Sequence, residues 1–563
     1  MTRPQWLRSE VIAGAHASSG LPRGLLLATL AGALLMLWPL GSAGEEGLED
    51  SPRPAARSPE LLAEAKDIYA LQCTACHGEK GAGDGEAAYL LYPQPRNFRA
   101  AYFRLTTTEN RVPTDADLYR TITRGIPGSS MASWQHLPEN VRWGLAYLIR
   151  DFWQDGLAAA LLEEDEDVDD DEIEELIVVL TTPGQPITVP EGPEESAESR
   201  ASGREIYVER CQSCHGPEGR GDGTEVQRTL EGYLISPADY TQGLFKGGSE
   251  GAQLYYRIAK GMAGTPMPES ELDPEQIWQL VHYIRSLAKP GAEQNALQGR
   301  STIRATRVTG SLSDDPLSPL WAEAAPKYIA LRPLWWRRQR IDGVMVRALY
   351  NSEEISLLLS WEDPAADMDA LKTTQFGDGA AVQLSHDDDP PFFGMGSAEK
   401  PVNIWHWKAA WEQDASERRD VELVYPDMAV DIYQQAQGSG GAVEDGAIPP
   451  TQVHTATFLT GQGAGNALSA PSHPSRIEDL NARSFGTLSA QPKGSQNVLG
   501  KGLWKKGIWR VVLRRSLETD DGWDVKLSPQ ETVRIAFAVW DGAAGDRDGQ
   551  KAVSIWHELE LTD

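Results

Sequence analysis

The sequence predicts a multidomain chain in which two small all-α domains are followed by a mainly antiparallel β-sandwich. The chain has 563 residues, which exceeds the usual size of a single domain. A cysteine motif near residue 73 recurs near residue 211 with matching flanks, as expected for a duplicated domain. From about residue 316 onward, helix and loop patterns give way to short runs of β-branched and aromatic residues.

Composition and charge limit the classes of partner. Hydrophobic residues make up 40% of the chain and charged residues 24%, so most of it is expected to fold around buried cores. The formal net charge is -30, which disfavours nucleic acid and anionic lipid surfaces. The same charge favours basic partners that approach by electrostatic steering, and basic redox proteins such as soluble or membrane cytochromes fit that description.

The N-terminal segment, residues 1–44, has the order of an export signal. Arginines at positions 3, 8 and 23 precede an apolar stretch over 24–40, and small residues follow at 41–44. The apolar stretch is at the lower limit for spanning a bilayer, so the alternative is an uncleaved N-terminal helix that tethers the protein. Both alternatives predict a periplasmic or otherwise extracytoplasmic location.

The motif C-x-x-C-H occurs at Cys73–His77 and again at Cys211–His215. In this motif two thiols add to the haem vinyl groups and the histidine ligates the iron. The glycine-rich segments that follow, Gly78–Gly85 and Gly216–Gly223, also match. The alternative is two disulfides or zinc clusters, since all four cysteines lie in these motifs. The residues predicted to hold two covalent c-type haems are Cys73, Cys76, His77, Cys211, Cys214 and His215.

Each repeat also contains a methionine suited to the sixth coordination position of iron. Met131 follows His77 by 54 residues, and Met267 follows His215 by 52 residues (131 − 77 and 267 − 215). A thioether opposite the histidine raises the reduction potential and leaves no open site for a substrate. Met262 competes with Met267 in the second repeat. The alternative for these methionines is ordinary core packing.

Each repeat closes with an expected helix, over 141–153 and over 275–287, whose apolar face packs onto the helix before the motif. Taken with the motifs, residues 59–155 and 199–290 resemble class I cytochrome c domains. The resemblance implies small all-α domains with histidine and methionine ligands and partly exposed haem edges.

Two linkers are expected. Residues 156–198 contain an acidic run over 163–175 and then a proline-rich stretch, which favours a flexible, solvated linker. The alternative function for this acidic run is a docking patch for a cationic cytochrome. Residues 291–315 form the second expected linker.

The C-terminal region, residues 316–563, predicts an antiparallel sandwich. Apolar and polar residues alternate over 355–361, and residues 508–512 and 533–540 are rich in β-branched and aromatic types between turns. Twelve of the chain's 18 tryptophans lie in this region and suggest a thick aromatic core.

A series of segments in this region resembles the haem-binding γ-subunit domain of ethylbenzene dehydrogenase, a domain type shared with chlorate and selenate reductases and nitrite oxidoreductases. The resemblance implies a non-covalent b-type haem held between a methionine and a lysine, here Met395 and Lys551. The segments that carry it are 342–347, 360–363, 392–396, 403–408, 537–542 and 551–556.

Some features of the sequence leave open which lysine would ligate the b-type haem. An expected insertion over about 412–498 departs from shorter family members, and the rival lysines are Lys501, Lys505 and Lys506. A lysine that donates to iron must be neutral, so the ligand should lie in a desolvated pocket that lowers its pKa. Lys551 could instead be a surface lysine. His406 and His557 are further candidates, although histidines between tryptophans usually pack in the core.

Three haems on one chain predict an electron-transfer protein without a catalytic site of its own, because the redox chemistry belongs to the cofactors. The sequence has no dinucleotide fingerprint, no P-loop and no cysteine set for an iron–sulfur cluster. The leading hypothesis is a haem subunit that passes electrons between a molybdenum oxidoreductase, with nitrite oxidoreductase the first choice, and a respiratory cytochrome. The partners would then be the catalytic and iron–sulfur subunits of that enzyme.

Alternative functions are a free-standing periplasmic shuttle, a dihaem peroxidase-like enzyme with one five-coordinate haem, and a haem-based sensor or carbohydrate-binding sandwich.

Overall fold

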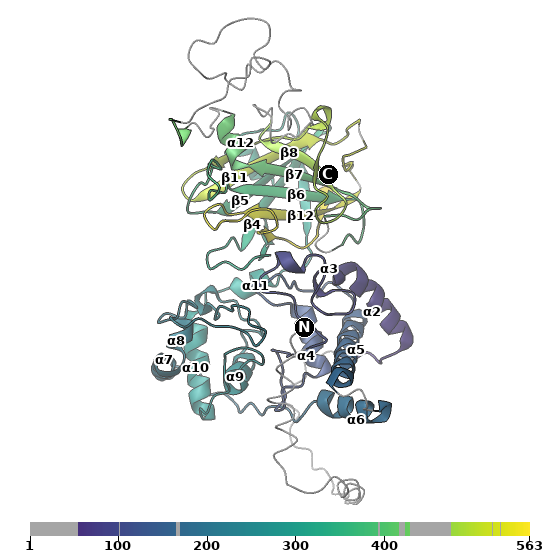
Figure 1. Cartoon of the computed structure of the whole chain (residues 1–563). Coiled ribbons are helices and arrows are strands. Elements are labelled where there is room, and N and C mark those ends of the chain that lie inside the picture. Colours follow the sequence, from purple (N-terminus) through teal and green to yellow (C-terminus); the bar gives the residue numbers. More distant parts are fainter. Residues whose placement is uncertain are drawn as a thin grey trace, which may run out of the picture. The chain divides into compact units, whose positions relative to one another are not determined.

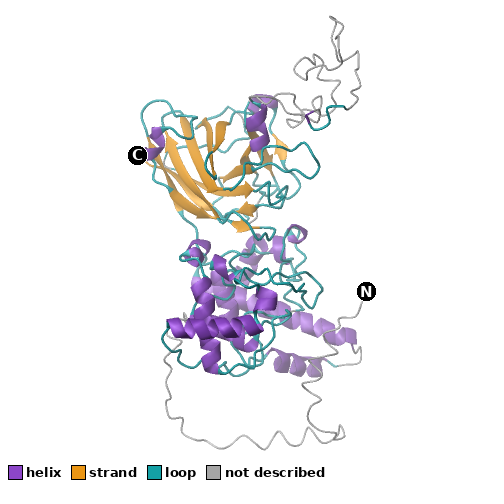
Figure 2. Cartoon of the chain, turned by 90° about the vertical axis from the view of Figure 1, so that its left-hand side faces the viewer, coloured by secondary structure: helices purple, strands orange, loops and turns teal. Residues whose placement is uncertain are grey.

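The structure is a computed structural model that describes residues 54–100, 102–164, 169–391, 395–415, 423–427, 475–520, 522–529 and 531–562. In these segments, no helix combines the length and the hydropathy needed to cross a membrane. The predicted export signal at 1–44 lies outside the described residues. As predicted, helical domains precede a domain of strands (Figure 2).

The first helical domain is built on the crossing of α2 (Pro59–Gln72) and α5 (Glu139–Glu164). Ser58 caps α2 because its hydroxyl accepts a hydrogen bond from the Leu61 N–H. The motif follows as the single turn α3 (Thr74–His77), and α4 (Asp115–Arg124) completes the bundle with the short η2 (Ala88–Leu90). Aromatic residues on α4 and α5 fill the core, where Tyr119 and Trp143 stack at 4.3 Å.

The second helical domain repeats this plan. Helices α7 (Ala197–Arg210) and α10 (Pro274–Leu287) cross as α2 and α5 do, and the motif turn is α8 (Gln212–His215). Here α9 (Gly251–Lys260) takes the place of α4, with η3 (Tyr240–Gln242) ahead of it. The two closing helices confirm the ones predicted over 141–153 and 275–287, although α5 continues for eleven further residues, from 153 to 164.

The acidic segment expected to be a flexible linker is partly helical. Helix α6 (Asp170–Thr181) is capped by Asp169, whose side chain accepts a hydrogen bond from the Glu172 N–H. The acidic residues of its first turn are stabilised by the positive end of the helix dipole. Ile173 is buried, and the Arg150 guanidinium of α5 donates to the Thr181 carbonyl. Capping and one apolar contact thus order a run whose charges stay exposed, so the expectation of a wholly flexible linker was wrong for 170–181.

The C-terminal domain is a single sheet of 14 described strands that folds back on itself (Figure 1). Its main path runs β10-β11-β5-β4-β1-β14-β12-β6-β7-β8-β9, with β2, β3 and β13 beside it. All described pairings are antiparallel except those of β1, which lies parallel to β4 and β14. The bounds are β1 Thr302–Arg307, β2 Lys327–Ala330, β3 Arg332–Pro333, β4 Gly343–Tyr350, β5 Glu354–Glu362, β6 Gly379–Ser385, β7 Val402–Lys408, β8 Ile477–Ala482, β9 Ser489–Ala490, β10 Leu499–Trp504, β11 Ile508–Ser516, β12 Thr532–Trp540, β13 Ala552–Val553 and β14 His557–Thr562, with the short helices α11 Ala292–Ala296, η4 Pro319–Glu323, α12 Ala409–Asp414 and η9 Lys493–Ser495.

The two halves of this sheet face each other across one aromatic core, as expected for a sandwich. The ring centre of Trp407 on β7 lies 4.8 Å from that of Trp509 on β11 and 6.2 Å from that of Trp361 on β5. Neither β11 nor β5 is a hydrogen-bonded neighbour of β7. All three indoles are nearly inaccessible. The tryptophan-rich composition is therefore explained by packing.

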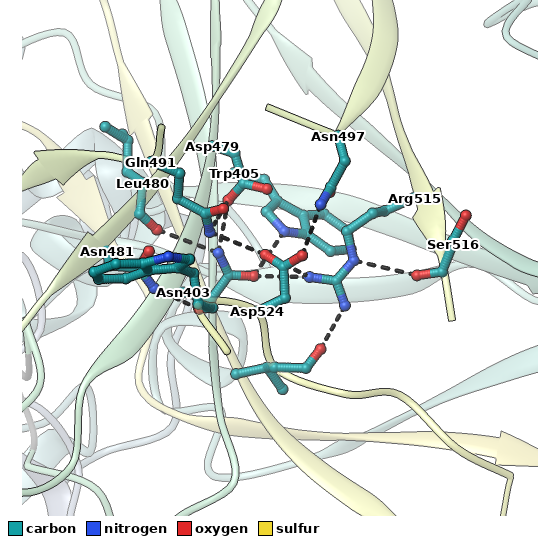
Figure 3. Close-up of polar contacts among 12 residues, drawn as sticks. Asn403, Trp405, Asp479, Leu480, Asn481, Gln491, Asn497, Arg515, Ser516 and Asp524 are labelled. Carbon is teal, nitrogen blue, oxygen red and sulfur yellow. Dashed lines mark hydrogen bonds and ion pairs between the residues drawn. The ribbon is translucent and has the colours of Figure 1, made fainter. Parts of the chain in front are cut away.

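One buried arginine of this sandwich is well compensated. Arg515 is fully buried and forms an ion pair with Asp524 at 3.3 Å, and its guanidinium also donates to the Asn403 side-chain oxygen at 3.0 Å (Figure 3). Gln491 and Asn497 donate to the same aspartate. Such compensation is what a buried charge needs in order to be tolerated.

Two predicted boundaries differ from the structure. Strand β1 lies inside the linker expected over 291–315, because a six-residue strand with alternating burial was hidden beside polar sequence. Strands β8 and β9 lie inside the insertion expected over 412–498, and β8 pairs with β7 as part of the sheet. Residues 428–474 of that expected insertion lie outside the described residues.

Candidate haem sites

The two motif histidines have the same orientation. The Nδ1–H of His77 donates to the Arg96 carbonyl at 3.1 Å, and that of His215 donates to the Ala238 carbonyl at 3.2 Å. A histidine held through Nδ1 presents Nε2 to a metal. Burial lowers the pKa of both imidazoles, that of His77 to about 4, which favours the neutral form that ligates iron.

The aromatic residue beside each histidine differs. Phe98 stacks on His77 at 4.5 Å, and Tyr240 stacks on His215 at 4.7 Å. Equivalent backbone hydrogen bonds fix both residues: the Phe98 N–H donates to the Gly81 carbonyl, and the Tyr240 N–H donates to the carbonyl of its counterpart Gly219. The Tyr240 hydroxyl lies 3.2 Å from Nε2 of His215. Iron at this nitrogen would displace that contact, which has no counterpart in the first domain.

All four cysteines are free thiols, so the two-disulfide alternative does not describe this structure. Cys73 and Cys211 end α2 and α7, and each packs partly buried against its domain core. Burial raises the pKa of Cys73 and Cys76 to about 12 and that of Cys211 to about 11. The sulfurs of Cys73, Cys76 and Cys211 are therefore desolvated, which suits a thioether to a porphyrin edge. The Cys214 sulfur has polar neighbours instead, because it accepts from the Gln227 side-chain amide at 3.2 Å and donates to the Glu225 carboxylate at 3.5 Å.

The loop after each histidine requires glycine. Gly78 and Gly216 have φ of 76° and 79°, and a β-carbon on either would overlap an aspartate carboxylate, that of Asp84 or Asp222. Each glycine carbonyl accepts from a buried tyrosine hydroxyl, at 2.8 Å in the first domain and 2.6 Å in the second. The repeated glycines seen in the sequence thus hold the motif turn in one conformation.

The methionine loops also superpose in their hydrogen bonding. Ile126 N–H donates to the Met131 carbonyl at 2.9 Å, and Met262 N–H donates to the Met267 carbonyl at 3.1 Å. By this equivalence Met267 corresponds to Met131, whereas its rival Met262 takes the place of Ile126, a residue that cannot ligate iron. The loops therefore favour Met131 and Met267 as the pair of sixth ligands.

A cavity of about 610 Å³ brings the second set of residues together. Its lining includes Cys211, Cys214 and His215 together with Met262 and Met267. These donors match what a c-type haem needs: two thiols, one imidazole and one thioether. In the first domain, Cys73 and Met131 are both packed against the same core cluster. The residues present therefore fit two c haems.

Buried cations near this cavity were missed by sequence reasoning. Lys246 and Arg257 line it, and no described residue forms a hydrogen bond or ion pair with the Lys246 amine. Burial, followed by the charges of Arg104 and Arg96, lowers the pKa of Lys246 to about 8. Nε of Arg104 is buried without a partner. These residues follow no motif and come from distant segments, so no sequence signal could have grouped them.

Met395 borders a shelf of small residues on the outer face of the sandwich. Met395 packs against the same apolar cluster as Ala381 on β6 and Ala536 and Ala538 on β12, and Trp540 ends the row. Ala381 and Ala538 are direct partners in the strand register. These small side chains and their larger neighbours, such as Ile404 and Trp556, form an apolar surface, which suits a porphyrin face. Residues 392–394, beside Met395, lie outside the described residues.

Lys551 adjoins the same shelf. Its Nζ lies 4.7 Å from the centre of the Trp540 ring, and burial lowers its pKa to about 8. This is the desolvated environment that a neutral lysine ligand requires. The rivals Lys501, Lys505 and Lys506 are all exposed. Geometry therefore favours Lys551 over them, and the surface-lysine alternative does not fit its surroundings.

The two candidate histidines differ in their access to the shelf. His406 on β7 stacks on Trp540 at 4.7 Å, so it lies beside Lys551, and burial places its pKa well below the ordinary value. His557 is buried, and its Nδ1 accepts from the Ser301 N–H at 3.2 Å. Of these two histidines, His406 is thus the one that a haem bound on the shelf would contact.

Family comparisons agree with this division of the chain. Residues 320–552 match the family model described as ethylbenzene dehydrogenase. The match covers the C-terminal domain, which is therefore similar to that family. Residues 201–288 match the cytochrome c model, and residues 60–149 match that of subunit III of cbb3-type cytochrome c oxidase. These matches confirm the predicted combination of an ethylbenzene dehydrogenase-type domain with two cytochrome c domains.

Two relatives of this chain are gamma subunits. The dimethylsulfide dehydrogenase subunit gamma of Rhodovulum sulfidophilum is 27% identical over 39% of this chain and 61% of its own length. The chlorate reductase subunit gamma of Ideonella dechloratans is 25% identical over 48% of this chain and 89% of its own length. The chain thus spans about six tenths of the first relative. A chain of the reducing HAO-like protein complex of Kuenenia stuttgartiensis is 35% identical over 40% of this chain and 96% of that one, with a TM-score of 0.34.

Proposed function

We propose that this chain is the electron-transfer haem subunit of an extracytoplasmic molybdenum oxidoreductase complex and that it carries one b-type and two c-type haems. The observation that carries the proposal is the occurrence, on one chain, of two equivalent C-x-x-C-H turns facing methionine loops and of a shelf bordered by Met395 and Lys551. Its gamma-subunit relatives, named for dimethylsulfide dehydrogenase and chlorate reductase, support the choice of enzyme class.

Each haem would be held by residues already described. The c haems take His77 with Met131 and His215 with Met267, and Met395 with Lys551 would hold the b haem. When bound, the haems supply one-electron redox chemistry, while the protein fixes their axial ligands and surroundings. With these side chains as ligands, the haems would have no position left for a substrate. The chain's own task is then to conduct electrons.

The buried cations would hold the carboxylate groups that every haem carries. Lys246 and Arg257 line the second c-haem cavity, and Arg104 contributes a buried, unpartnered N–H nearby. Arg257 already donates to the Thr106 carbonyl and the Gln253 side chain, whereas no described residue forms an ion pair with Lys246. A haem propionate would supply the anionic partner that Lys246 lacks, since buried charge is tolerated when it is paired. A cation close to iron also stabilises the more electron-rich, reduced state and so raises the potential.

The wider assignment concerns the enzyme and the cytochrome on either side. Nitrite oxidoreductase stays our first choice of catalytic partner, because a series of fused c-type and b-type haem domains that conducts electrons suits a respiratory enzyme. The net charge of -30 favours a basic cytochrome as the other partner. The arginines and apolar stretch at the N-terminus support export across the membrane.

Purification of the full chain from its native membrane tests the proposal. We expect the pyridine haemochrome spectrum to give one haem b for about every two haems c, and we expect molybdenum and further subunits to copurify. Loss of thioether-linked haem at either cysteine pair, or turnover of a small molecule by the isolated chain, would overturn it. Only haem c in the spectrum would support the alternative of an empty C-terminal sandwich.

The dihaem peroxidase-like alternative makes a different spectral prediction. It needs one five-coordinate c haem, so one of the two methionine-to-iron charge-transfer bands would be absent. The matched loops at Met131 and Met267 favour two ligated irons instead.

A further inference from the structure

Three carboxylates converge at one end of the β-domain, next to the Trp540 end of the shelf described above. Asp363 follows β5, Asp378 precedes β6, and Asp541 follows β12. One oxygen of each lies within 4.8 Å of the others. Because β5 belongs to one half of the folded sheet and β6 and β12 to the other, the cluster joins the two halves where their strands end.

No cation among the described residues balances these charges. None of the three aspartates forms an ion pair, and Asp363 is 2% exposed with its Oδ2 buried and without a hydrogen-bond partner. A fourth carboxylate, Asp367, also has a buried Oδ2 without a partner. This contrasts with Asp524 in the same domain, which is paired with Arg515 (Figure 3).

Burial, with repulsion from the neighbouring carboxylates, raises the pKa of Asp363 to about 6 and that of Asp378 to about 7. Asp378 is anchored by donors: the Trp509 Nε1–H and the Gly542 N–H both lie 2.9 Å from its oxygens. Asp378 is therefore held in place. The Asp363 carboxyl accepts from the Ala365 N–H and lies near the Trp361 indole, but its buried Oδ2 lacks the full set of partners that a carboxylate without a cation requires.

We propose that Asp363, Asp378 and Asp541 bind one calcium ion. The donors are all oxygens, which selects a hard cation over zinc or copper, and neither histidine nor cysteine belongs to the cluster. Calcium is favoured over magnesium because magnesium usually keeps several waters, and Asp363 and Asp378 are both 2% exposed. Nothing in the haem assignment requires this ion.

The ion would fix the segment that leads to Lys551. Asp541 directly follows Trp540, whose ring lies under Lys551, and Gly542 donates to Asp378. The segment from 541 to 551 is thus tied at its start to the proposed site and ends at the candidate haem ligand. This consequence for the b haem rests on the proposed function, whereas the ion site does not.

Metal analysis of the full-length holoprotein tests the site. We expect about one calcium per chain after gel filtration in chelator-free buffer. After treatment with EGTA, added CaCl₂ should bind with a stoichiometry near one in calorimetry and should raise the thermal midpoint. Asp363→Asn should weaken calcium binding at least about tenfold, because it removes a charged ligand. Asp171→Asn, an exposed aspartate on α6, is the matched control and should change neither quantity.

A site that binds no calcium would give an equally specific set of results. If the carboxyls are protonated and hold no ion, the wild-type protein will contain no stoichiometric calcium, CaCl₂ will not shift its midpoint, and Asp363→Asn will be as stable as the wild type or more so. That set of results would overturn the proposal, and the wild-type measurements decide it even if the variant fails to fold. Haem content is measured separately by pyridine haemochrome, so a failed haem assignment would not be mistaken for a failed calcium site.

Discussion

Removal of a single methionine sulfur tests which residues close the two c-haem sites. The methionine loops have the same pair of backbone and side-chain hydrogen bonds, with Ser129 in the first taking the part of Thr265 in the second. Two equivalent loops predict two methionine-ligated irons, each of which contributes about half of the absorbance of the far-red charge-transfer band. Met267→Ala should therefore remove about half of that band in the oxidised protein, and Met131→Ala the other half.

Met262→Ala is the matched control, because Met262 lines the same cavity but stands in the position of Ile126. It should leave the band at full strength. Redox titration of the same samples should show one c haem shifted to lower potential in Met267→Ala and none in Met262→Ala, since the thioether raises the potential. A half-strength band in Met262→Ala with a full band in Met267→Ala would reverse the ligand assignment, and an unchanged band in both would refute methionine ligation of this haem.

Three further predictions follow from other contacts. Lys551→Ala should lower the ratio of haem b to haem c in the purified chain, whereas Lys501→Ala, at an exposed position on β10, should not; equal ratios would exclude Lys551 as the ligand. Lys246→Met should lower the potential of the second c haem by removing a buried cation, and a rise would contradict its role beside a propionate. Gly203→Ala should speed hydrogen exchange in α7 and α10 roughly 5-fold to 150-fold, equivalent to about 1–3 kcal/mol of overpacking, because its β-carbon would lie 2.5 Å from the Gln279 carbonyl carbon. Gly144→Ala, where the nearest atom is the Ala65 β-carbon at 3.0 Å, should have a much smaller effect, and equal effects would argue against the close helix crossing.

Local motifs allowed much of the helical half to be predicted. The spacing in C-x-x-C-H dictates which atoms meet, because adjacent residues on one turn share a single haem edge, and the repeat placed Met131 and Met267 in equivalent loops. Helix α6 was missed because a run of like charge usually stays unfolded, while here a cap at Asp169 and the buried Ile173 suffice to order it. Strand β1 was missed because its partners, β4 and β14, are distant in sequence.

Long-range contacts explain what the sequence could not show in the sites themselves. Lys551 became the favoured lysine only through its distance to Trp540 and its burial, which depend on packing between β12 and the segment before β13. The Lys246 and Arg104 cations come from segments more than a hundred residues apart, and the three aspartates follow or precede strands spread over residues 363–541. Neither group has a local pattern, so only the fold reveals them.

Differences between the two c-haem sites bear on the direction of electron flow. The covalent attachment, the histidine orientation and the methionine loop are shared, so these features alone would give two haems of similar potential. The surroundings differ in two ways. Phe98 beside His77 is apolar, whereas Tyr240 beside His215 carries a hydroxyl. Each histidine also has a cation nearby, because, besides burial, the charge of Arg96 lowers the pKa of His77 and that of Lys246 lowers the pKa of His215. Arg96 forms an ion pair with Glu231 at 3.7 Å, whereas Lys246 forms none with a described residue. An uncompensated cation near the second iron would favour its reduced state, so the second c haem is expected to have the higher potential. Two haems of unequal potential on one chain give transfer a preferred direction, toward the second domain, which duplication of an identical site would not provide.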